Sequence, residues 1–171
     1  AVAEALAACP LGSTIQVSAP LGAGFDWARA HGTHVVLVVA GTGLAVAPPI
    51  LRARLREALA LETTMFLGSD GPVPLEPELV AAHAGGISLQ VCSLVAVPAH
   101  AGSTLPWVHT SLEHAVEKLL ASRRSRAERR TSLVAAGPEA LLDGLAACVD
   151  RENARARLEG QPAWCVLLRN A

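Results

Sequence analysis

The stretch THVVLVVAGTG, residues 33–43, decides the fold expected for this chain. From residue 35 to residue 40 every side chain is aliphatic, with no alternation of polar and apolar residues. This pattern is typical of a central parallel strand that is covered on both faces, here expected over residues 33–40. The strand is expected to stop at Gly41, where Gly-Thr-Gly begins. Residues 48–59 then start with two prolines and space their Ile and Leu residues as an amphipathic helix does.

The alternation of strand and helix continues to the end of the chain. Further strands are expected at residues 63–67, 87–97, 131–136 and 163–168, and further helices at residues 75–84, 111–130 and 138–157. Strands that alternate with helices indicate βαβ units. The sequence therefore predicts an α/β fold: a doubly wound, five-stranded parallel sheet with helices on both faces.

The beginning of the chain differs from this pattern. Residues 13–19 alternate polar and apolar side chains, which indicates a strand with one solvated face. This segment runs into the turn-rich sequence Pro20-Leu21-Gly22. We therefore expect residues 1–30 to be the terminal strand and linker of another module, and residues 31–171 to be the complete α/β domain.

The composition limits the class of protein. The chain has 171 residues, of which 51% are hydrophobic and 17% charged, and its formal net charge is -1. A chain of this kind can bury a sizeable core, and its small net charge gives no long-range attraction to nucleic acid or to an anionic membrane. Its longest apolar run is far shorter than the roughly 20 residues that span a bilayer. We expect a soluble protein without a nucleic-acid partner.

The four cysteines, Cys9, Cys92, Cys148 and Cys165, are far apart and form no Cys-x-x-Cys pair. Neither a structural zinc site nor a redox dithiol is predicted. Buried free thiols are the expectation, because cysteine packs as a small hydrophobic residue. Free thiols favour an intracellular, reducing compartment, either cytoplasmic or organellar.

Two other kinds of site find no support. His31 with His34, and His109 with His114, have spacings that do not put both rings on one face of a regular element. We therefore expect no metal site. No serine lies in a Gly-x-Ser-x-Gly elbow, so a hydrolase is not predicted.

Glycine corners at two strand ends are the main candidate site. Gly41-Thr42-Gly43 follows the most hydrophobic strand, and Gly137-Pro138 follows the strand at residues 131–136. Ligands of open α/β sheets bind at the carboxyl ends of the strands, and backbone amides at a helix start favour phosphate. The alternative for Gly41-Thr42-Gly43 is a tight connection without a ligand.

These motifs, in this order, resemble the pyridine-nucleotide domain of the ferredoxin reductase and cytochrome b5 reductase superfamily. Pro20-Leu21-Gly22 resembles the turn after the last strand of that family's flavin-binding barrel. The sequence Gly41-Thr42-Gly43-Leu44-Ala45 is similar to the family's G-T-G-[IL]-A-P, and Ala136-Gly137-Pro138 to its C-G-P. The resemblance implies that residues 1–30 carry a remnant strand of a flavin-binding β-barrel.

The resemblance also implies roles for individual residues. Gly41, Thr42 and Gly43 would hold the pyrophosphate of NADH, and Gly137 with Pro138 would flank the nicotinamide. Pro20, Leu21 and Gly22 would face a flavin. Asp70 occupies the place of the family's arginine for an adenosine phosphate, so NADH is favoured over NADPH.

The chain also departs from the family pattern. The family's proline after G-T-G-[IL]-A is Val46 here, and the family's cysteine and methionine at the second motif are Ala136 and Leu141. No tyrosine is present, so the family's R-x-Y-[ST] flavin motif is missing. FAD is therefore expected only if an N-terminal segment or a partner subunit supplies it.

Two functions remain open at this stage. One is the NADH domain of a flavin-dependent reductase, cofactor-poor or degenerate in this chain, which in its active form passes hydride to a flavin held elsewhere. The other is a structural subunit of a larger assembly, which keeps the reductase fold as a packing module after its cofactor residues were lost. Both imply a protein partner or a further segment.

Overall fold

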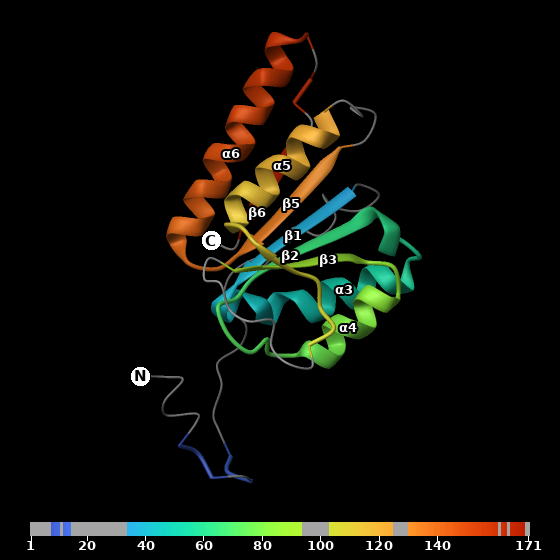
Figure 1. The fold of residues 1–171 in the computed structure, drawn as a ribbon, viewed down its shortest axis with the longest axis vertical. Coiled ribbons are helices and arrows are strands. Elements are labelled where there is room, and N and C mark those ends of the chain that lie inside the picture. Colours follow the sequence, from blue (N-terminus) through green and yellow to red (C-terminus); the bar gives the residue numbers. More distant parts are fainter. Residues whose placement is uncertain are drawn as a thin grey trace.

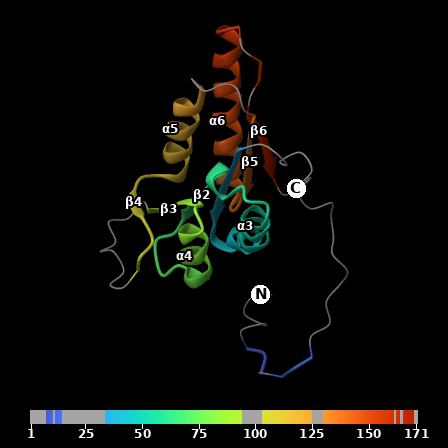
Figure 2. The ribbon, with the colours of Figure 1, turned by 90° about the vertical axis from the view of Figure 1, so that its right-hand side faces the viewer.

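The computed structural model describes residues 8–10, 12–14, 34–93, 103–124, 130–160, 162–163 and 165–169. Within these residues, six parallel strands form one sheet. Figures 1 and 2 show α5 and α6 on one side of this sheet and α3 and α4 on the other. The α/β class, the parallel sheet and the helices on both faces agree with the sequence-based prediction.

The described elements follow one another as strand and helix. In chain order they are β1 (His34–Ala40), the 3-10 helix η1 (Gly41–Val46), α3 (Ala47–Arg56), the 3-10 helix η2 (Ala60–Glu62), β2 (Thr63–Gly68), α4 (Glu76–Ala84), β3 (Ser88–Ser93), β4 (Trp107–His109), α5 (Leu112–Arg124), β5 (Thr131–Ala136), α6 (Glu139–Leu158) and β6 (Cys165–Arg169). The order of the strands across the sheet is β4-β3-β2-β1-β5-β6. The chain therefore moves outward from β1 in one direction and then returns to build the other half from β5.

Strand β1 lies at the centre because its side chains suit burial on both faces. From Val35 to Val39 none is exposed to solvent. Val35, Leu37 and Val39 join a core cluster that includes residues of α3 and α4, whereas Val36 and Val38 join a second cluster with residues of α5 and α6. This alternation is the two-residue period of a strand, expressed in a strand that has no solvated face.

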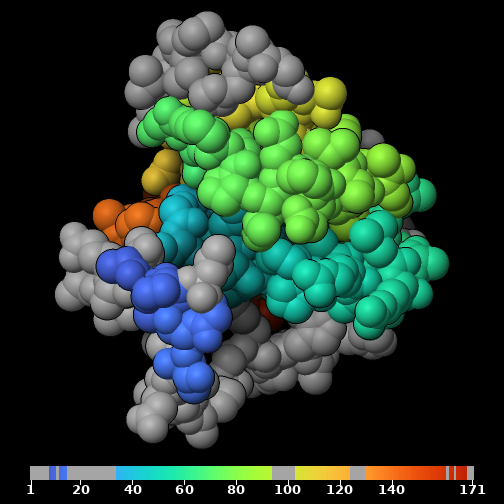
Figure 3. Space-filling view, turned by 90° about the horizontal axis from the view of Figure 1, so that it is seen from below, coloured from blue at the N-terminus to red at the C-terminus, as the bar shows by residue number. Residues whose placement is uncertain are grey.

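The helices begin and pack as their sequences suggest. Pro48 and Pro49 lie in the first turn of α3, where a missing amide hydrogen costs nothing. Ile50 and Leu51 turn toward the sheet and are buried. Figure 3 views the molecule from the side of α3 and α4, whose atoms form one continuous surface over that face.

The predicted number of strands was wrong. The sheet has six strands, because Trp107–His109 pairs with β3 as the edge strand β4. No strand was predicted at residues 107–109. A three-residue strand is too short to show the period of two on which prediction relies.

Some predictions concern residues that the structure does not describe. Of the strand expected at residues 13–19, only Ser13 and Thr14 are described, and neither is in a strand. Pro20, Leu21 and Gly22 also lie outside the described residues, and so does the boundary near residue 30. The flavin-barrel remnant therefore stays a prediction. Among the described helices, none combines the length and the apolar character needed to cross a membrane.

The cysteines lead to a prediction about reactivity. All four are free, with Cys9 exposed and Cys92, Cys148 and Cys165 buried. Burial raises the pKa of Cys92 to about 11 and that of Cys165 to about 12, and it also raises the pKa of Cys148. Since the thiolate is the reactive form, an aromatic disulfide reagent at neutral pH should modify Cys9 rapidly and the other three only as the protein unfolds. Absorbance of the released thiol measures this, and rapid release of several equivalents from the native protein would contradict it.

Candidate functional site

The ends of three neighbouring strands meet at one edge of the sheet. Ala40 at the end of β1 pairs with Gly68 at the end of β2, and Val39 pairs with Ala136 at the end of β5. The segments after these strands therefore leave the sheet at nearly the same level. Between β1 and β5 the order of the strands reverses, which makes this edge the topological switch point where ligands of doubly wound sheets bind.

The two glycine corners lie against each other at this point. A Cβ atom on Gly43 would overlap the carbonyl group of Ala136 and would lie 2.8 Å from the backbone nitrogen of Gly137. A Cβ atom on Gly137 would lie 3.4 Å from both the Cβ and the carbonyl oxygen of Ala40. Only a residue without a side chain fits at Gly43, so this glycine serves the close approach of η1 to the end of β5.

The segment expected to be a phosphate-binding loop is helical. Gly41–Val46 forms the 3-10 helix η1, which runs directly into α3 at Ala47. The amide of Ala47 donates to the carbonyl oxygen of Leu44 at this junction. Gly41 takes a φ of 55° to turn the chain out of β1, a conformation that glycine adopts without the cost that a Cβ atom brings.

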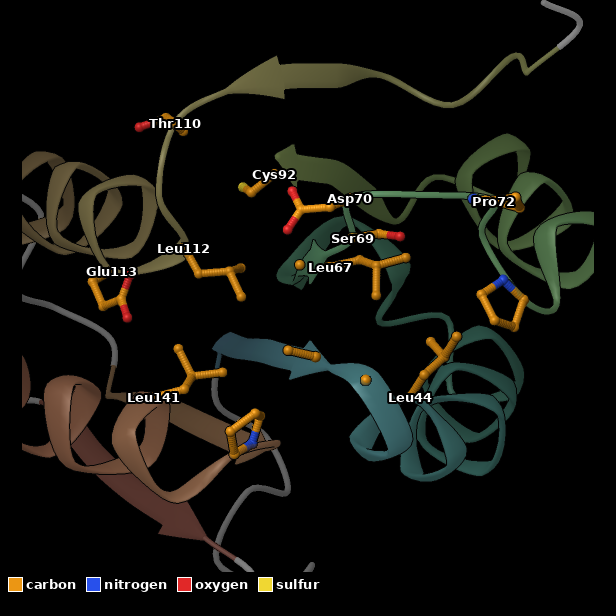
Figure 4. A pocket seen from close by; sticks show the side chains of 15 residues that line it. Leu44, Leu67, Ser69, Asp70, Pro72, Cys92, Thr110, Leu112, Glu113 and Leu141 are labelled. Atoms are coloured by element: carbon orange, nitrogen blue, oxygen red, sulfur yellow. The ribbon is translucent and has the colours of Figure 1, made fainter. Parts of the chain in front are cut away.

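A cavity of about 590 Å³ opens beside the corners. Its residues come from the carboxyl ends of β1, β2 and β3, from the segment after β2, and from the beginnings of α5 and α6. In Figure 4, Asp70 and Cys92 lie on one side of the cavity and Leu141 on the opposite side, with Leu112 and Glu113 between them. This volume falls within the range of about 300–1,000 Å³ that is usual for small-molecule sites.

Some of the residues singled out from the sequence line this cavity. Those that do are Gly41, Leu44, Asp70 and Pro138. Thr42, Gly43, Ala45 and Gly137 are not lining residues, although they belong to the same two corners. The structure brings the two predicted corners together, and Gly41, Leu44 and Pro138 are the residues of these corners that line the cavity.

Asp70 is held in the turn that follows β2. The hydroxyl of Ser93, at the end of β3, donates to Oδ1 of Asp70 at 2.9 Å. Within the turn, the hydroxyl of Ser69 donates to the carbonyl oxygen of Gly71 at 3.1 Å. The bond from Ser93 links the end of β3 to the turn after β2 and holds the Asp70 carboxylate at the wall of the cavity, while the bond from Ser69 closes the turn itself.

Two helices begin at the cavity. Leu112 and Glu113 open α5, and Pro138 directly precedes Glu139, the first residue of α6. The positive ends of both helix dipoles therefore lie at this edge of the sheet and favour negative charge. Each first turn already carries an acidic side chain, Glu113 in α5 and Glu139 in α6. Among the described lining residues, the charged side chains are Asp70 and Glu113, both acidic.

Sequence reasoning missed the wall formed by Cys92, Leu112 and Glu113. Cys92 is the second-last residue of β3, and burial raises the pKa of its thiol to about 11. It therefore lines the cavity as a protonated, apolar group rather than as a nucleophile. A usable signal existed for α5: Ser111, whose hydroxyl accepts a hydrogen bond from the amide of His114, marks a helix start that follows a strand end.

No three His, Cys, Asp or Glu side chains within the described ranges gather as a set that could hold a metal ion. Comparison with known proteins does not identify a relative. No protein-family model matches the chain, and no curated protein matches it significantly.

Proposed function

We propose that this chain is a dinucleotide-binding domain of the ferredoxin reductase type, which binds NADH and passes its hydride to a flavin held by another segment or by a partner subunit. The observation that carries the proposal is the direct contact of two glycine corners at the β1–β5 switch point, beside a cavity of about 590 Å³. In open α/β sheets, ligands bind at such a switch point, outside the carboxyl ends of the strands.

Different lining residues suit the pyrophosphate, the nicotinamide and the ribose of a dinucleotide. Backbone amides near Gly41 and the beginning of α6 at Pro138 are the groups available for a pyrophosphate. The apolar wall of Leu112, Pro138 and Leu141 suits the flat nicotinamide ring. Asp70, held by Ser93, suits a ribose hydroxyl, which donates to a carboxylate.

In this proposal the cofactor supplies the electrons and the protein positions the cofactor. A nicotinamide supplies two electrons and a proton as hydride, and the protein contributes position and electrostatics. Ala136 stands where the resemblance puts a cysteine at the nicotinamide, so the ring would be oriented by the apolar side chains of Leu112, Pro138 and Leu141. The described residues provide no groups that we assign to a flavin.

Thermal unfolding with NADH tests the proposal. NADH at about ten times its dissociation constant should raise the unfolding free energy by about 1.4 kcal/mol, which raises Tm by about 3–6 °C for a chain of this size. NADPH should bind about tenfold more weakly, because its 2'-phosphate would meet the Asp70 carboxylate. Replacement of Asp70 by Asn should reduce the difference between the affinities for NADH and NADPH.

A blocked variant provides the control. Thr110 lies at the rim of the cavity in Figure 4, and Thr110→Trp should abolish the NADH shift by filling the opening. The matched variant is Leu61→Trp, at a position that is 86% exposed in η2 and precedes β2 at the opposite edge of the sheet. It should keep the full shift. The absence of any shift at millimolar NADH in the unmodified chain would refute the proposal.

A structural subunit is the second candidate function. The specific observation in its favour is the charge of the cavity, whose charged described lining residues are both acidic and would repel a pyrophosphate. This function requires a protein partner and predicts no response to NADH. In either case, four free cysteines fit a reducing compartment.

A further inference from the structure

We infer that a second hollow, the groove between α5 and the strands β3 and β4, binds small carboxylic acids that have an apolar body. The groove has a volume of about 520 Å³. Of its described lining residues, Thr110 is the one that also lines the cavity beside the glycine corners. The inference does not depend on NADH binding, because the groove is a different site from the one proposed for the dinucleotide.

The groove exists because two helices do not cover a face of six strands. Packed helices lie about 8–10 Å apart and strands about 4.8 Å apart, so one helix covers about two strands. On this face α6 packs against β5 and β6, and α5 packs against α6, β2 and β3 (Figure 1). The side of α5 that faces away from α6 therefore meets the outer strands at a groove.

The wall of this groove contains apolar side chains from both layers. Phe66 of β2 and Ala115 of α5 are buried lining residues, and Val108 of β4 and Leu119 of α5 are half-buried ones. An apolar ligand body placed against them would remove apolar surface of both partners from water, which is the main source of affinity in small-molecule sites.

Polar side chains from two elements line the same groove. His114, Lys118 and Ser122 are four residues apart, so they form one row along α5. Gln90 lies on β3, where it pairs with Phe66 in the register of the sheet. Within the described ranges, the side chains of Gln90, His114 and Lys118 make no hydrogen bond or ion pair. Their polar groups can therefore bind a ligand without breaking a contact of the fold.

The charge of the groove selects the kind of ligand. Lys118 is the only lysine of the chain, and no Asp or Glu is among the described lining residues of the groove. An ammonium group and the amide of Gln90 offer donors, which suits a carboxylate because its oxygens only accept hydrogen bonds. One positive charge balances the single charge of a carboxylate, whereas a phosphate monoester carries nearly two.

Three ligands that share one apolar body test the inference: phenylbutyrate, the neutral phenylbutanol and the cationic phenylbutylamine. Amide NMR shifts of the full chain at low ionic strength and pH 7 measure both the affinity and the place of binding. Phenylbutyrate should bind about fivefold more tightly than phenylbutanol, which is the effect of one partly exposed charge-assisted hydrogen bond. Phenylbutylamine should bind most weakly, and the amide shifts should lie in α5, β3 and β4.

Variants assign the preference to Lys118. Lys118→Gln should make phenylbutyrate and phenylbutanol bind about equally, and Lys118→Arg, which keeps the charge, should retain most of the fivefold ratio. The matched control is Arg52→Gln, which removes an exposed positive charge from α3 on the other face of the sheet. This variant should keep the ratio.

The outcomes separate this inference from the proposed function. Absence of binding, equal affinities for the three ligands, or a preference that survives in Lys118→Gln would overturn the inference. Shifts confined to Gly41–Val46 and the first turn of α6 would also overturn it, because they would put the acid in the other cavity. None of these results alters the response of the thermal unfolding to NADH, which tests the proposed function by itself.

Discussion

Replacement of Gly43 by alanine should lower the unfolding free energy by at least about 3 kcal/mol, which is the range of severe overpacking. The added Cβ atom would overlap the carbonyl group of Ala136 and approach the backbone nitrogen of Gly137. Both obstacles are backbone atoms of the β5 corner, so no side chain can rotate away to relieve the contact. Denaturant unfolding followed by circular dichroism measures the change.

Two glycines act as controls for this substitution. Gly71 has open space around its Cα and a φ outside the left-handed region, so Gly71→Ala should change stability by less than about 0.5 kcal/mol. Gly41 also has open space, but its φ is 55°, and Gly41→Ala should cost about 1 kcal/mol. A Gly43→Ala variant as stable as Gly71→Ala would show that the two corners do not touch.

Acid should weaken the fold through His34. This histidine is 2% exposed at the beginning of β1, and its Nε2 lies 3.3 Å from the hydroxyl of Thr64. Burial, with the positive charges of Arg123 and Arg54 adding to it, lowers the pKa of His34 from 6.5 to about 3. Below pH 6.5 the unfolded chain therefore takes up a proton that the folded protein does not, and the unfolding free energy falls until the pH reaches about 3.

The expected loss from His34 is about 2 kcal/mol between pH 7 and pH 5. This loss arises because His34 takes up a proton only in the unfolded chain. His34→Gln should therefore remove this part of the pH dependence of the unfolding free energy. His109 is exposed, and His109→Gln should leave the pH dependence unchanged. Unfolding curves in urea at several pH values give the slope of the unfolding free energy against pH for the original chain, His34→Gln and His109→Gln. Equal slopes for the original chain and His34→Gln would contradict a buried neutral His34.

The elements with a strong local pattern were predictable. The aliphatic run of β1 indicates a strand that is buried on both faces, and the structure has His34–Ala40 in that place. Strand β5 was predicted with its observed bounds, Thr131–Ala136. These segments are recognisable because burial on two faces demands apolar side chains at every position.

The elements that depend on distant contacts were not predictable. Strand β4 exists because Val91 of β3 pairs with Trp107, an interaction that leaves no period in three residues. Glu113 reaches the cavity because α5 packs beside α6 and begins at the same edge of the sheet as the end of β2. The sequence pattern marks the glycine-rich strand ends, whereas the start of a helix at the same edge carries no pattern that assigns it to a cavity.

Two residues that differ from the resembled motif lie at or near the cavity. Ala136 and Leu141 replace the cysteine and methionine of the resembling motif, yet Leu141 still lines the cavity beside Pro138. The described lining of the cavity is mostly apolar, and its charged lining residues, Asp70 and Glu113, are acidic.

Hydrogen–deuterium exchange with and without NADH tests the central claim most directly. If the cavity at the β1–β5 switch point binds the dinucleotide, amides of Gly41–Val46 and of the first turn of α6 should exchange more slowly when NADH is present. Peptides from the opposite edge, including η2 before β2, should be unaffected. Unchanged exchange at both glycine corners under millimolar NADH, or protection confined to the opposite edge, would contradict the proposed function.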